Sequence, residues 1–247
     1  FGYCLVADTK YEKLLLLVGE GSNGKSTLIN VLTALIGTQN ISTISLSSLE
    51  QQFHRAALYQ KLVNVSTEFE ISELLTSGYL KSIVSGDRID ACFKFKDGFS
   101  FNPFCRIVVA MNELPRVRDK SFGFYRRLLI IPFKKRFDGD TADKLLKQKL
   151  CEELDGIFLW ALEGLKRLYK NDSFTESEQV TKTIDEYRKS NNPVSVFLEE
   201  QCEVDRLEKV GKQLLYVAYK HFCQDNGFNK MNNVNFAKEL RRLIPNL

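Results

Sequence analysis

Runs of apolar residues mark the strands of an expected sheet in the first half of the chain. Leu14 to Val18 has no polar alternation, which is typical of a strand buried on both faces of a parallel sheet. Residues 62–65 and 106–111 form two further apolar segments. Between 28 and 36 the apolar residues recur at helical spacing, and Gly37 stands where a helix would end. This pattern predicts an α/β fold.

An alternating pattern in the middle of the chain predicts a β-hairpin. Between residues 91 and 101 apolar side chains occupy alternate positions, and Asp97-Gly98 is a strong two-residue turn signal. We expect the phenylalanines, Phe95 included, to share one face of this hairpin. Lys94 and Lys96 would share the other face, beside the tip.

The second half of the chain reads as helical. Residues 151–170 carry a wide apolar face that includes Trp160, which we expect in the core. Asn191-Asn192-Pro193 interrupts the following charged helical stretch and predicts a break. Residues 211–228 and 232–247 then form two amphipathic helices joined at Gly227, the pattern of a helix-turn-helix. Its basic surface would comprise Lys230, Lys238, Arg241 and Arg242.

The sequence GEGSNGKST follows the first apolar run directly and precedes the first helical pattern. Strand, glycine loop and helix in this order are the context in which G-x-x-x-x-G-K-[ST] indicates a phosphate-binding loop. Glycines let backbone N–H groups converge on phosphate oxygens, and the helix start adds its positive dipole end. Lys25 would reach the β- and γ-phosphates and Ser26 would hold Mg²⁺. The expected ATP-binding residues are Gly19, Glu20, Gly21, Ser22, Asn23, Gly24, Lys25, Ser26 and Thr27.

Polar side chains at the ends of the other strands are candidates for the chemistry beside the phosphates. Glu68 ends the segment after residues 62–65, where a carboxylate could orient water or accept its proton. Glu68 is the preferred candidate, with an ordinary surface acid at a strand end as the alternative, and Glu70 is a weaker candidate. Asn112 ends the 106–111 segment, although it could also be a turn residue before Pro115.

Composition is that of a globular protein with uneven charge. The chain has 247 residues and a net charge of +4, but residues 88–136 alone carry +8 and residues 205–247 carry +4. Clustered positive charge suits a surface that faces nucleotide or nucleic acid, although such runs are often only solvated faces. Six scattered cysteines without a C-x-x-C pair argue against a zinc site. No apolar segment reaches membrane-spanning length, so we expect a cytoplasmic protein.

In order along the chain, the motifs resemble a superfamily 3 helicase. The loop, the strand ending in Glu68, the lysine-bearing hairpin, the strand ending in Asn112 and Arg126-Arg127 before an apolar strand carry the resemblance. More narrowly, GEGSNGKST, IVSGDRI, NELP and FYRRLLIIPF are similar to the ATPase region of phage, plasmid and pathogenicity-island primase-helicases, a group that includes the poxvirus replication enzyme. The resemblance is strong over residues 1–137 and looser beyond.

The resemblance implies a role for each matching residue. Gly19 to Ser26 matches the Walker A loop, Glu68 the Walker B acid, and Asn112 the sensor of the γ-phosphate. Arg126 and Arg127 match the arginine finger region, which acts on the ATP of a neighbouring subunit. Lys94 and Lys96 match the channel hairpin that grips one DNA strand through its phosphates.

The chain departs from the family at the Walker B position, where many relatives have two adjacent acids. Thr67 precedes Glu68 here. Magnesium binding could therefore depend on Ser26, phosphate and water, with Glu68 serving the attacking water. The division of labour between Glu68 and Glu70 stays open.

The resemblance also implies an architecture and partners. We expect a P-loop AAA+-like parallel sheet with flanking helices over residues 1–137, a helical continuation over 138–190, and a winged-helix-like domain over 191–247 that lacks its wing strands. ATP, Mg²⁺, single-stranded and duplex DNA and other copies in a hexamer would be its ligands and partners. A primase could precede Phe1, and the host would be bacterial.

We therefore expect an ATP-dependent, ring-forming DNA helicase module of a mobile-element replication protein. Two alternatives stay open. A P-loop kinase for a small acceptor would leave phosphate release insensitive to single-stranded DNA. A non-catalytic, ATP-gated origin-binding module would keep its activity after Glu68→Gln.

Overall fold

The computed structural model describes residues 1–67, 78–117, 121–205 and 207–244. The chain forms two compact units, Phe1–Ile184 and Asp185–Leu247, and the boundary falls within helix α7 (Glu178–Ser190). The division expected from the sequence, at residues 137 and 190, stays a prediction.

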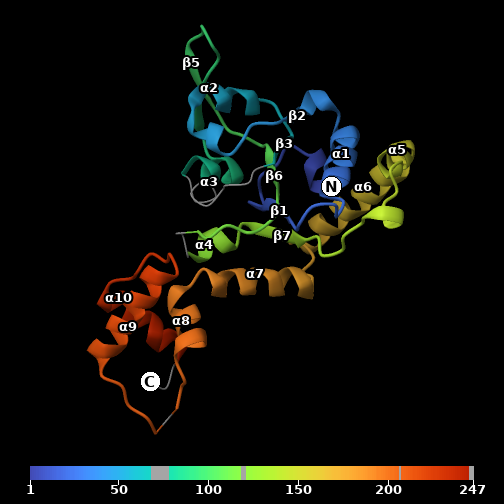
Figure 1. The fold of residues 1–247 in the computed structure, drawn as a ribbon. Helices are drawn as coiled ribbons and strands as arrows, with labels where there is room; N and C mark the ends of the chain where they lie inside the picture. Colours follow the sequence, from blue (N-terminus) through green and yellow to red (C-terminus); the bar gives the residue numbers. More distant parts are fainter. Residues whose placement is uncertain (68–77, 118–120, 206, 245–247) are drawn as a thin grey trace. The chain divides into compact units, whose positions relative to one another are not determined.

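A five-stranded sheet with strand order β2-β3-β6-β1-β7 organises the first unit, and every neighbouring pair is parallel (Figure 1). All six residues of β6 are buried, including Arg106, and the five residues after Arg106 form one apolar run, as expected for a central strand. The expected α/β fold is therefore confirmed. The strands are β1 (Leu14–Val18), β2 (Ile41–Ser42), β3 (Val63–Thr67), β6 (Arg106–Met111) and β7 (Leu128–Pro132).

Helix α1 (Lys25–Ile36) packs its apolar residues on one face of this sheet. Leu32 and Ile36 join Leu17, Val65 and Val108 in a single buried cluster. Helices α5 (Leu146–Glu152) and α6 (Leu154–Asn171) contact α1, and α6 also contacts the 3-10 helix η1 (Gly2–Leu5). Figure 1 shows α1, α5 and α6 on the same side of the sheet. The anchored α1 in turn fixes the loop that precedes it.

Short helices connect the strands. Helices α2 (Gln52–Arg55) and α3 (Gly78–Ser85) each contact the 3-10 helix η3 (Ser47–Glu50) and strand β4 (Ile89–Cys92), so these four elements form one group. Figure 1 shows α2 and α3 in this group. The remaining short elements of this unit are η2 (Thr38–Asn40), η4 (Ala56–Leu58), α4 (Phe122–Tyr125) and η6 (Gly139–Thr141).

Strands β4 (Ile89–Cys92) and β5 (Gly98–Phe101) form the expected antiparallel hairpin, which projects beyond α2 in Figure 1. The turn prediction was wrong. Cys92 pairs with Gly98, so residues 93–97 form the loop, and Phe93 O accepts a hydrogen bond from Lys96 N at 3.1 Å. Because Phe95 lies in this loop with φ +63°, it leaves the strand alternation and does not share a face with the other phenylalanines.

The predicted burial of Trp160 was also wrong. Its side chain is 66% exposed and its ring lies edge-on to Phe1, with the ring centroids 5.6 Å apart. The buried residues of α6 are Ala161 and Leu168. The apolar face of α6 is wider than the area that α1 and η1 cover, so part of it reaches solvent.

The second unit is a helical bundle. Helices α8 (Pro193–Gln201), α9 (Lys212–Asp225) and α10 (Asn233–Leu243) enclose a core that includes Phe197, Tyr219 and Phe236. Asn192 caps α8 by accepting a hydrogen bond from Val194 N, and Pro193 occupies the first turn, as the predicted break requires. Helices α9 and α10 lie on either side of Gly227, so the two amphipathic helices expected there are confirmed.

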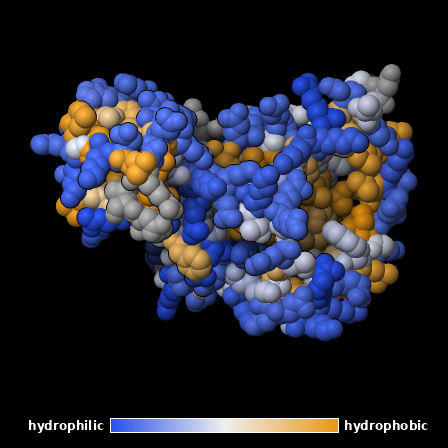
Figure 2. Space-filling model, turned by 90° about the horizontal axis from the view of Figure 1, so that it is seen from below, coloured by the Kyte–Doolittle hydropathy of each residue, from blue (hydrophilic) through white to orange (hydrophobic). Residues whose placement is uncertain are grey.

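Hydrophilic side chains cover most of the face seen in Figure 2, and hydrophobic groups appear there in separate patches. The helices within the described ranges include none that is both apolar and long enough to cross a membrane. Basic side chains of the second unit are solvent-exposed, among them Lys230, Lys238 and Arg241. Arg242 pairs with Glu239 at 2.6 Å.

Candidate functional site

The glycine loop connects the carboxyl end of β1 to the first turn of α1. A side chain at Gly19 would collide with the Phe133 carbonyl oxygen and the Asn23 amide, so this position requires glycine. Gly24, the residue before α1, has φ +92°, a conformation that L side chains rarely adopt. The sequence therefore places glycine where close approach and left-handed backbone demand it.

Lys25 begins α1 and is held by its own loop. Its ammonium donates hydrogen bonds to the Gly19 carbonyl, to the Glu20 carbonyl at 3.1 Å and to Asn23 Oδ1 at 3.0 Å. The residue is only 8% exposed, and burial lowers the pKa of its ammonium from the ordinary value. Such a desolvated cation, surrounded by neutral acceptors, interacts strongly with an anion that enters the loop.

Asn23 fixes the loop to the sheet. Its Nδ2 donates to the Phe133 carbonyl, immediately after β7, at 3.1 Å, while its Oδ1 accepts from Lys25. The side chain is buried. Asn23 therefore connects the lysine to the neighbouring strand, a role that the motif spacing did not reveal.

A cavity of about 350 Å³ lies against this loop at the carboxyl edge of the sheet. Its size is within the usual range for small-molecule sites, and this edge is where open α/β sheets bind ligands. The structure brings together Asn112, which follows β6, Thr67, which ends β3, and the loop. The lining residues are Gly21, Ser22, Asn23, Gly24, Lys25, Ser26, Thr27, Thr67, Ala110, Met111 and Asn112.

The residues of this cavity fit a nucleotide with Mg²⁺. The loop and the start of α1 offer backbone N–H groups and one ammonium to phosphate oxygens, and the Ser26 hydroxyl is a suitable metal ligand. Asn112 adds an amide that can both donate and accept. Glu68 and Glu70, the predicted acids, lie outside the described residues. The described part of the chain has no cluster of three or more histidine, cysteine or acidic side chains that could hold a metal.

Arg126 and Arg127 lie at the opposite edge of the sheet from the cavity. β1 and β7 are parallel with Leu14 beside Leu128 and Val18 beside Pro132, so the arginines precede β7 at the edge where β1 begins. The loop leaves β1 at the other edge, about 13 Å away at the usual rise of a strand. Neither arginine lines the cavity. The structure does not bring these predicted residues to the loop of their own chain.

Glu12 holds both arginines. Its carboxylate pairs with Arg126 at 2.5 Å and with Arg127 at 3.2 Å. Its backbone has φ +46°, which is uncommon outside glycine. Sequence reasoning missed Glu12 because it lies 114 positions before Arg126 and belongs to no motif.

The two arginines differ in their surroundings. Arg127 also donates to the Gly123 carbonyl at 2.6 Å and to Ser85 Oγ at 2.9 Å, and its side chain is 20% exposed. The Arg126 side chain is 42% exposed. Arg127 is therefore built into its own unit, while Arg126 is the more accessible of the pair.

Lys94 and Lys96 lie in the hairpin loop and are exposed, away from the cavity lining. The ammonium of Lys96 lies 5.7 Å from the centroid of the Phe93 ring, so the predicted separation of lysines and phenylalanines onto two faces was wrong. A five-residue loop, unlike a two-residue turn, does not preserve strand alternation.

Arg55 anchors the hairpin to the body of the first unit. It is buried, donates through Nε to the Asp90 carbonyl at 2.8 Å and pairs with the Asp90 carboxylate at 2.5 Å. Its guanidinium lies 3.8 Å from the centroid of the Tyr79 ring. Partial burial raises the pKa of the Asp90 carboxyl, but the hydrogen bond and charge of Arg55 outweigh it and leave that pKa below its ordinary value. The loop thus projects from a fixed base.

The fold is that of a parallel α/β protein with a cavity at the carboxyl ends of its strands. Family models match two parts of the chain. Residues 17–127 match a family of unknown function (DUF5906), and residues 189–246 match the family described as Poxvirus D5 protein-like.

Two viral proteins are similar to the chain. "Putative helicase L207/L206" of Acanthamoeba polyphaga mimivirus is 26% identical over 98% of this chain and 27% of its own length. "Putative helicase 184R" of Invertebrate iridescent virus 6 is 25% identical over 68% of this chain and 17% of its own length. The chain therefore spans less than a third of either relative.

The apo structure of the NrS-1 C terminal region (305-718) has the same fold. Its TM-score is 0.56 at 17% identity, and the match covers 94% of this chain and 61% of that chain. The chain is therefore similar to viral proteins named as helicases and, over residues 189–246, to the Poxvirus D5 protein-like family, in agreement with the resemblance of its motifs to superfamily 3 primase-helicases. The predicted phage origin and bacterial host stay predictions.

Proposed function

We propose that this chain is the ATP-hydrolysing module of a ring-forming DNA helicase that moves along single-stranded DNA. The observation that carries the proposal is the cavity where the glycine loop, Lys25 and Asn112 converge at one edge of the sheet. The viral relatives named as helicases support the same activity. The chain spans less than a third of these viral relatives, so the helicase activity itself is part of our proposal.

Within the cavity, the loop N–H groups and Lys25 would bind the phosphates. Ser26 would hold Mg²⁺, which neutralises phosphate charge when bound. Asn112 would orient the γ-phosphate and the attacking water, and Glu68 is the proposed acceptor of the water's proton. Since Arg126 lies at the far edge of the sheet, it would act on the nucleotide of a neighbouring subunit.

The ATPase rate should depend on assembly and on DNA. An arginine that acts across an interface makes each site incomplete in a monomer. We expect the steady-state rate per subunit to rise with protein concentration and again when single-stranded DNA is added. The measurement is phosphate release over a range of protein concentrations, with and without a single-stranded oligonucleotide. A rate that is flat in both would contradict the proposal.

Replacing Lys94 and Lys96 together with alanine should weaken binding to single-stranded DNA and leave basal ATPase unchanged. Both lysines are exposed and neither lines the cavity, so their replacement would remove charge that faces the DNA phosphates without altering the nucleotide site. The slope of log K against log salt should fall by about 0.7 for each phosphate of a single strand that the variant no longer neutralises.

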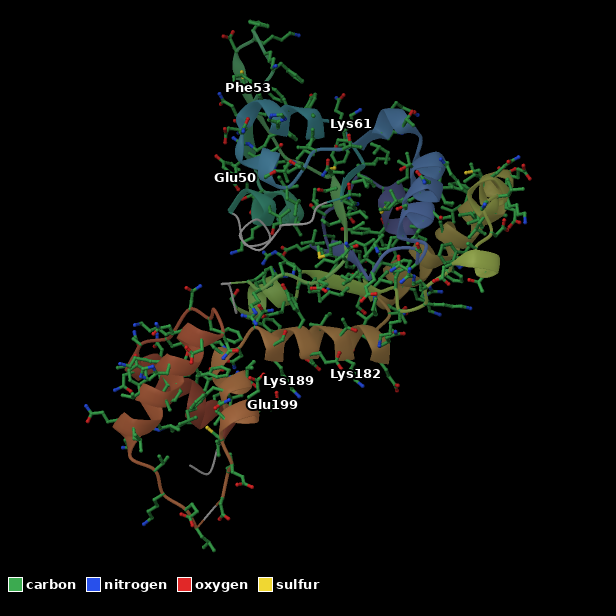
Figure 3. All side chains as sticks on the ribbon, in the orientation of Figure 1. Glu50, Phe53, Lys61, Lys182, Lys189 and Glu199 are labelled. Carbon is green, nitrogen blue, oxygen red and sulfur yellow. The ribbon has the colours of Figure 1, made fainter. Side chains whose placement is uncertain are left out.

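The matched control is Lys182→Ala with Lys189→Ala, on helix α7 (Figure 3). These changes remove the same charge elsewhere and should leave the salt slope as in the wild type. A loss of ATP binding in the hairpin variant would place the lysines at the nucleotide site and contradict their proposed role.

A further inference from the structure

The loop of the β4–β5 hairpin presents a phenylalanine in an unfavourable backbone conformation. Phe95 is fully exposed and has φ +63°. For a bulky residue this conformation is a true outlier, and glycine or asparagine would occupy it at lower cost. Exposure gives no burial energy to offset the strain. Strain held at an exposed apolar side chain indicates a function for that side chain.

The other aromatic rings of the hairpin are already partnered. Phe93 stacks on Phe99, and Phe99 on Phe101, with centroids 5.1 and 5.7 Å apart and interplanar angles of 16° and 26°. Tyr59 lies edge-on to both Phe99 and Phe101 at 5.3 Å. This ladder stiffens the hairpin up to Phe93. The Phe95 ring lies beyond it, at the tip, and has no ring partner among the described residues.

The charge around Phe95 identifies what it would contact. Lys94 and Lys96 flank it directly, and the 49 residues from 88 to 136 carry a net charge of +8. An apolar partner surface would satisfy the ring but leave the lysines unpaired. A single strand of nucleic acid offers phosphates to the lysines and unstacked bases to the ring. A duplex keeps its bases stacked inside and offers no ring face.

We propose that Phe95 is a base-stacking residue that holds an unpaired base of single-stranded nucleic acid at the hairpin tip, while Lys94 and Lys96 contact the phosphates beside it. This inference rests on the proposed function and adds a second kind of contact to it. The contacts of the lysines with phosphates weaken as the salt concentration rises, whereas the contact of the ring requires a base. Arg55 and the aromatic ladder supply the fixed base from which the ring projects.

The variant Phe95→Gly tests the effect of the ring on nucleic-acid binding without destabilising the fold. Glycine adopts positive φ freely, so the variant should unfold at the same temperature as the wild type or higher. Stacking of one base on an aromatic ring corresponds to roughly tenfold in affinity. We expect the wild type to bind an oligothymidylate about tenfold more tightly than an abasic strand of equal length. Phe95→Gly should remove this difference, and Phe95→Trp should retain it.

The matched control is Phe122→Ala, which removes another exposed phenylalanine, on α4, and should preserve the preference for bases. The stacking role is overturned if Phe95→Gly retains the wild-type preference, or if it weakens binding to both strands equally. The proposed function fails separately, through an ATPase that DNA does not stimulate. Loss of stacking with DNA-stimulated ATPase intact would leave the helicase proposal standing.

Discussion

Arg126→Ala is expected to lower the kcat of ATP hydrolysis about a thousandfold while ATP still binds. An arginine supplied across an interface stabilises charge that develops in the transition state and contributes little to ground-state binding. Arg126 is the accessible member of the pair and lies at the amino edge of the sheet, whereas its own loop lies at the other edge, which strand β1 reaches after about 13 Å. Steady-state phosphate release and equilibrium binding of a fluorescent ATP analogue measure the two quantities separately.

Mixing variants tests whether Arg126 acts on a neighbouring subunit. Arg126→Ala subunits retain the loop, and Lys25→Ala subunits retain the arginine. In a random one-to-one mixture, roughly a quarter of the interfaces would combine an intact loop with an intact arginine. At an ATP concentration too low to saturate the Lys25→Ala loop, ATPase should therefore recover in the mixture although each variant alone hydrolyses ATP far more slowly than the wild type. If no mixing ratio restores activity, Arg126 does not act in trans.

Arg127→Ala is the matched comparison at the adjacent position. Arg127 donates to the Gly123 carbonyl and to Ser85 Oγ, so its replacement removes internal hydrogen bonds and leaves acceptors unpaired. We expect a lower unfolding temperature for Arg127→Ala and an unchanged one for Arg126→Ala. Equal destabilisation of both variants would contradict the assignment of separate roles to the two arginines.

Lys25→Ala is expected to raise the Kd for ATP about a hundredfold. The variant would lack two charge-assisted hydrogen bonds to phosphate oxygens, which together correspond to about 2.7 kcal/mol. The variant should still fold, because removing a buried ammonium also removes its desolvation cost, but a lower unfolding temperature is expected since two backbone carbonyls and Asn23 lose a donor. Isothermal titration with ATP and Mg²⁺ and a thermal unfolding curve measure both effects.

Lys10→Ala is the control for Lys25. Lys10 forms an exposed ion pair with Asp172 and does not line the cavity. Its replacement removes the same charge from the same unit and should leave ATP affinity within twofold or so of the wild type, since exposed pairs contribute little. ATP binding by Lys25→Ala at wild-type affinity would show that the cavity is not the phosphate site.

Local patterns were sufficient to predict most elements of the fold. The run at Leu14 to Val18 became β1, and the helical spacing after Lys25 became α1, which ends at Gly37. Continuous apolar residues require burial on both faces, and glycine is needed where φ is positive, so both signals are local. Asn192 and Pro193 likewise marked the start of α8, because capping involves residues two or three positions apart.

Two errors came from treating a local pattern as if it fixed the tertiary environment. The alternation of residues 91–101 predicted that Phe95 shares a face with the other phenylalanines of the hairpin. Instead Cys92 pairs with Gly98, and Phe95 is one of the five residues of the loop between them. The apolar face of α6 predicted a buried Trp160, but the packed partners cover Ala161 and Leu168 instead. The pairing of two strands and the area that a neighbour covers both depend on residues distant in sequence.

The sequence by itself determined the strands β1, β3, β6 and β7, the glycine loop and the order of the candidate residues, because each is encoded within a few consecutive positions. It did not predict the two-residue strand β2. Only the tertiary structure decided which of the candidate residues meet. Parallel strands bring their carboxyl ends to one edge, so the loop, Thr67 and Asn112 share a cavity while Arg126 and Arg127 lie at the other edge with Glu12. Contacts between residues more than a hundred positions apart arise from the strand order of the sheet, which no local pattern specifies.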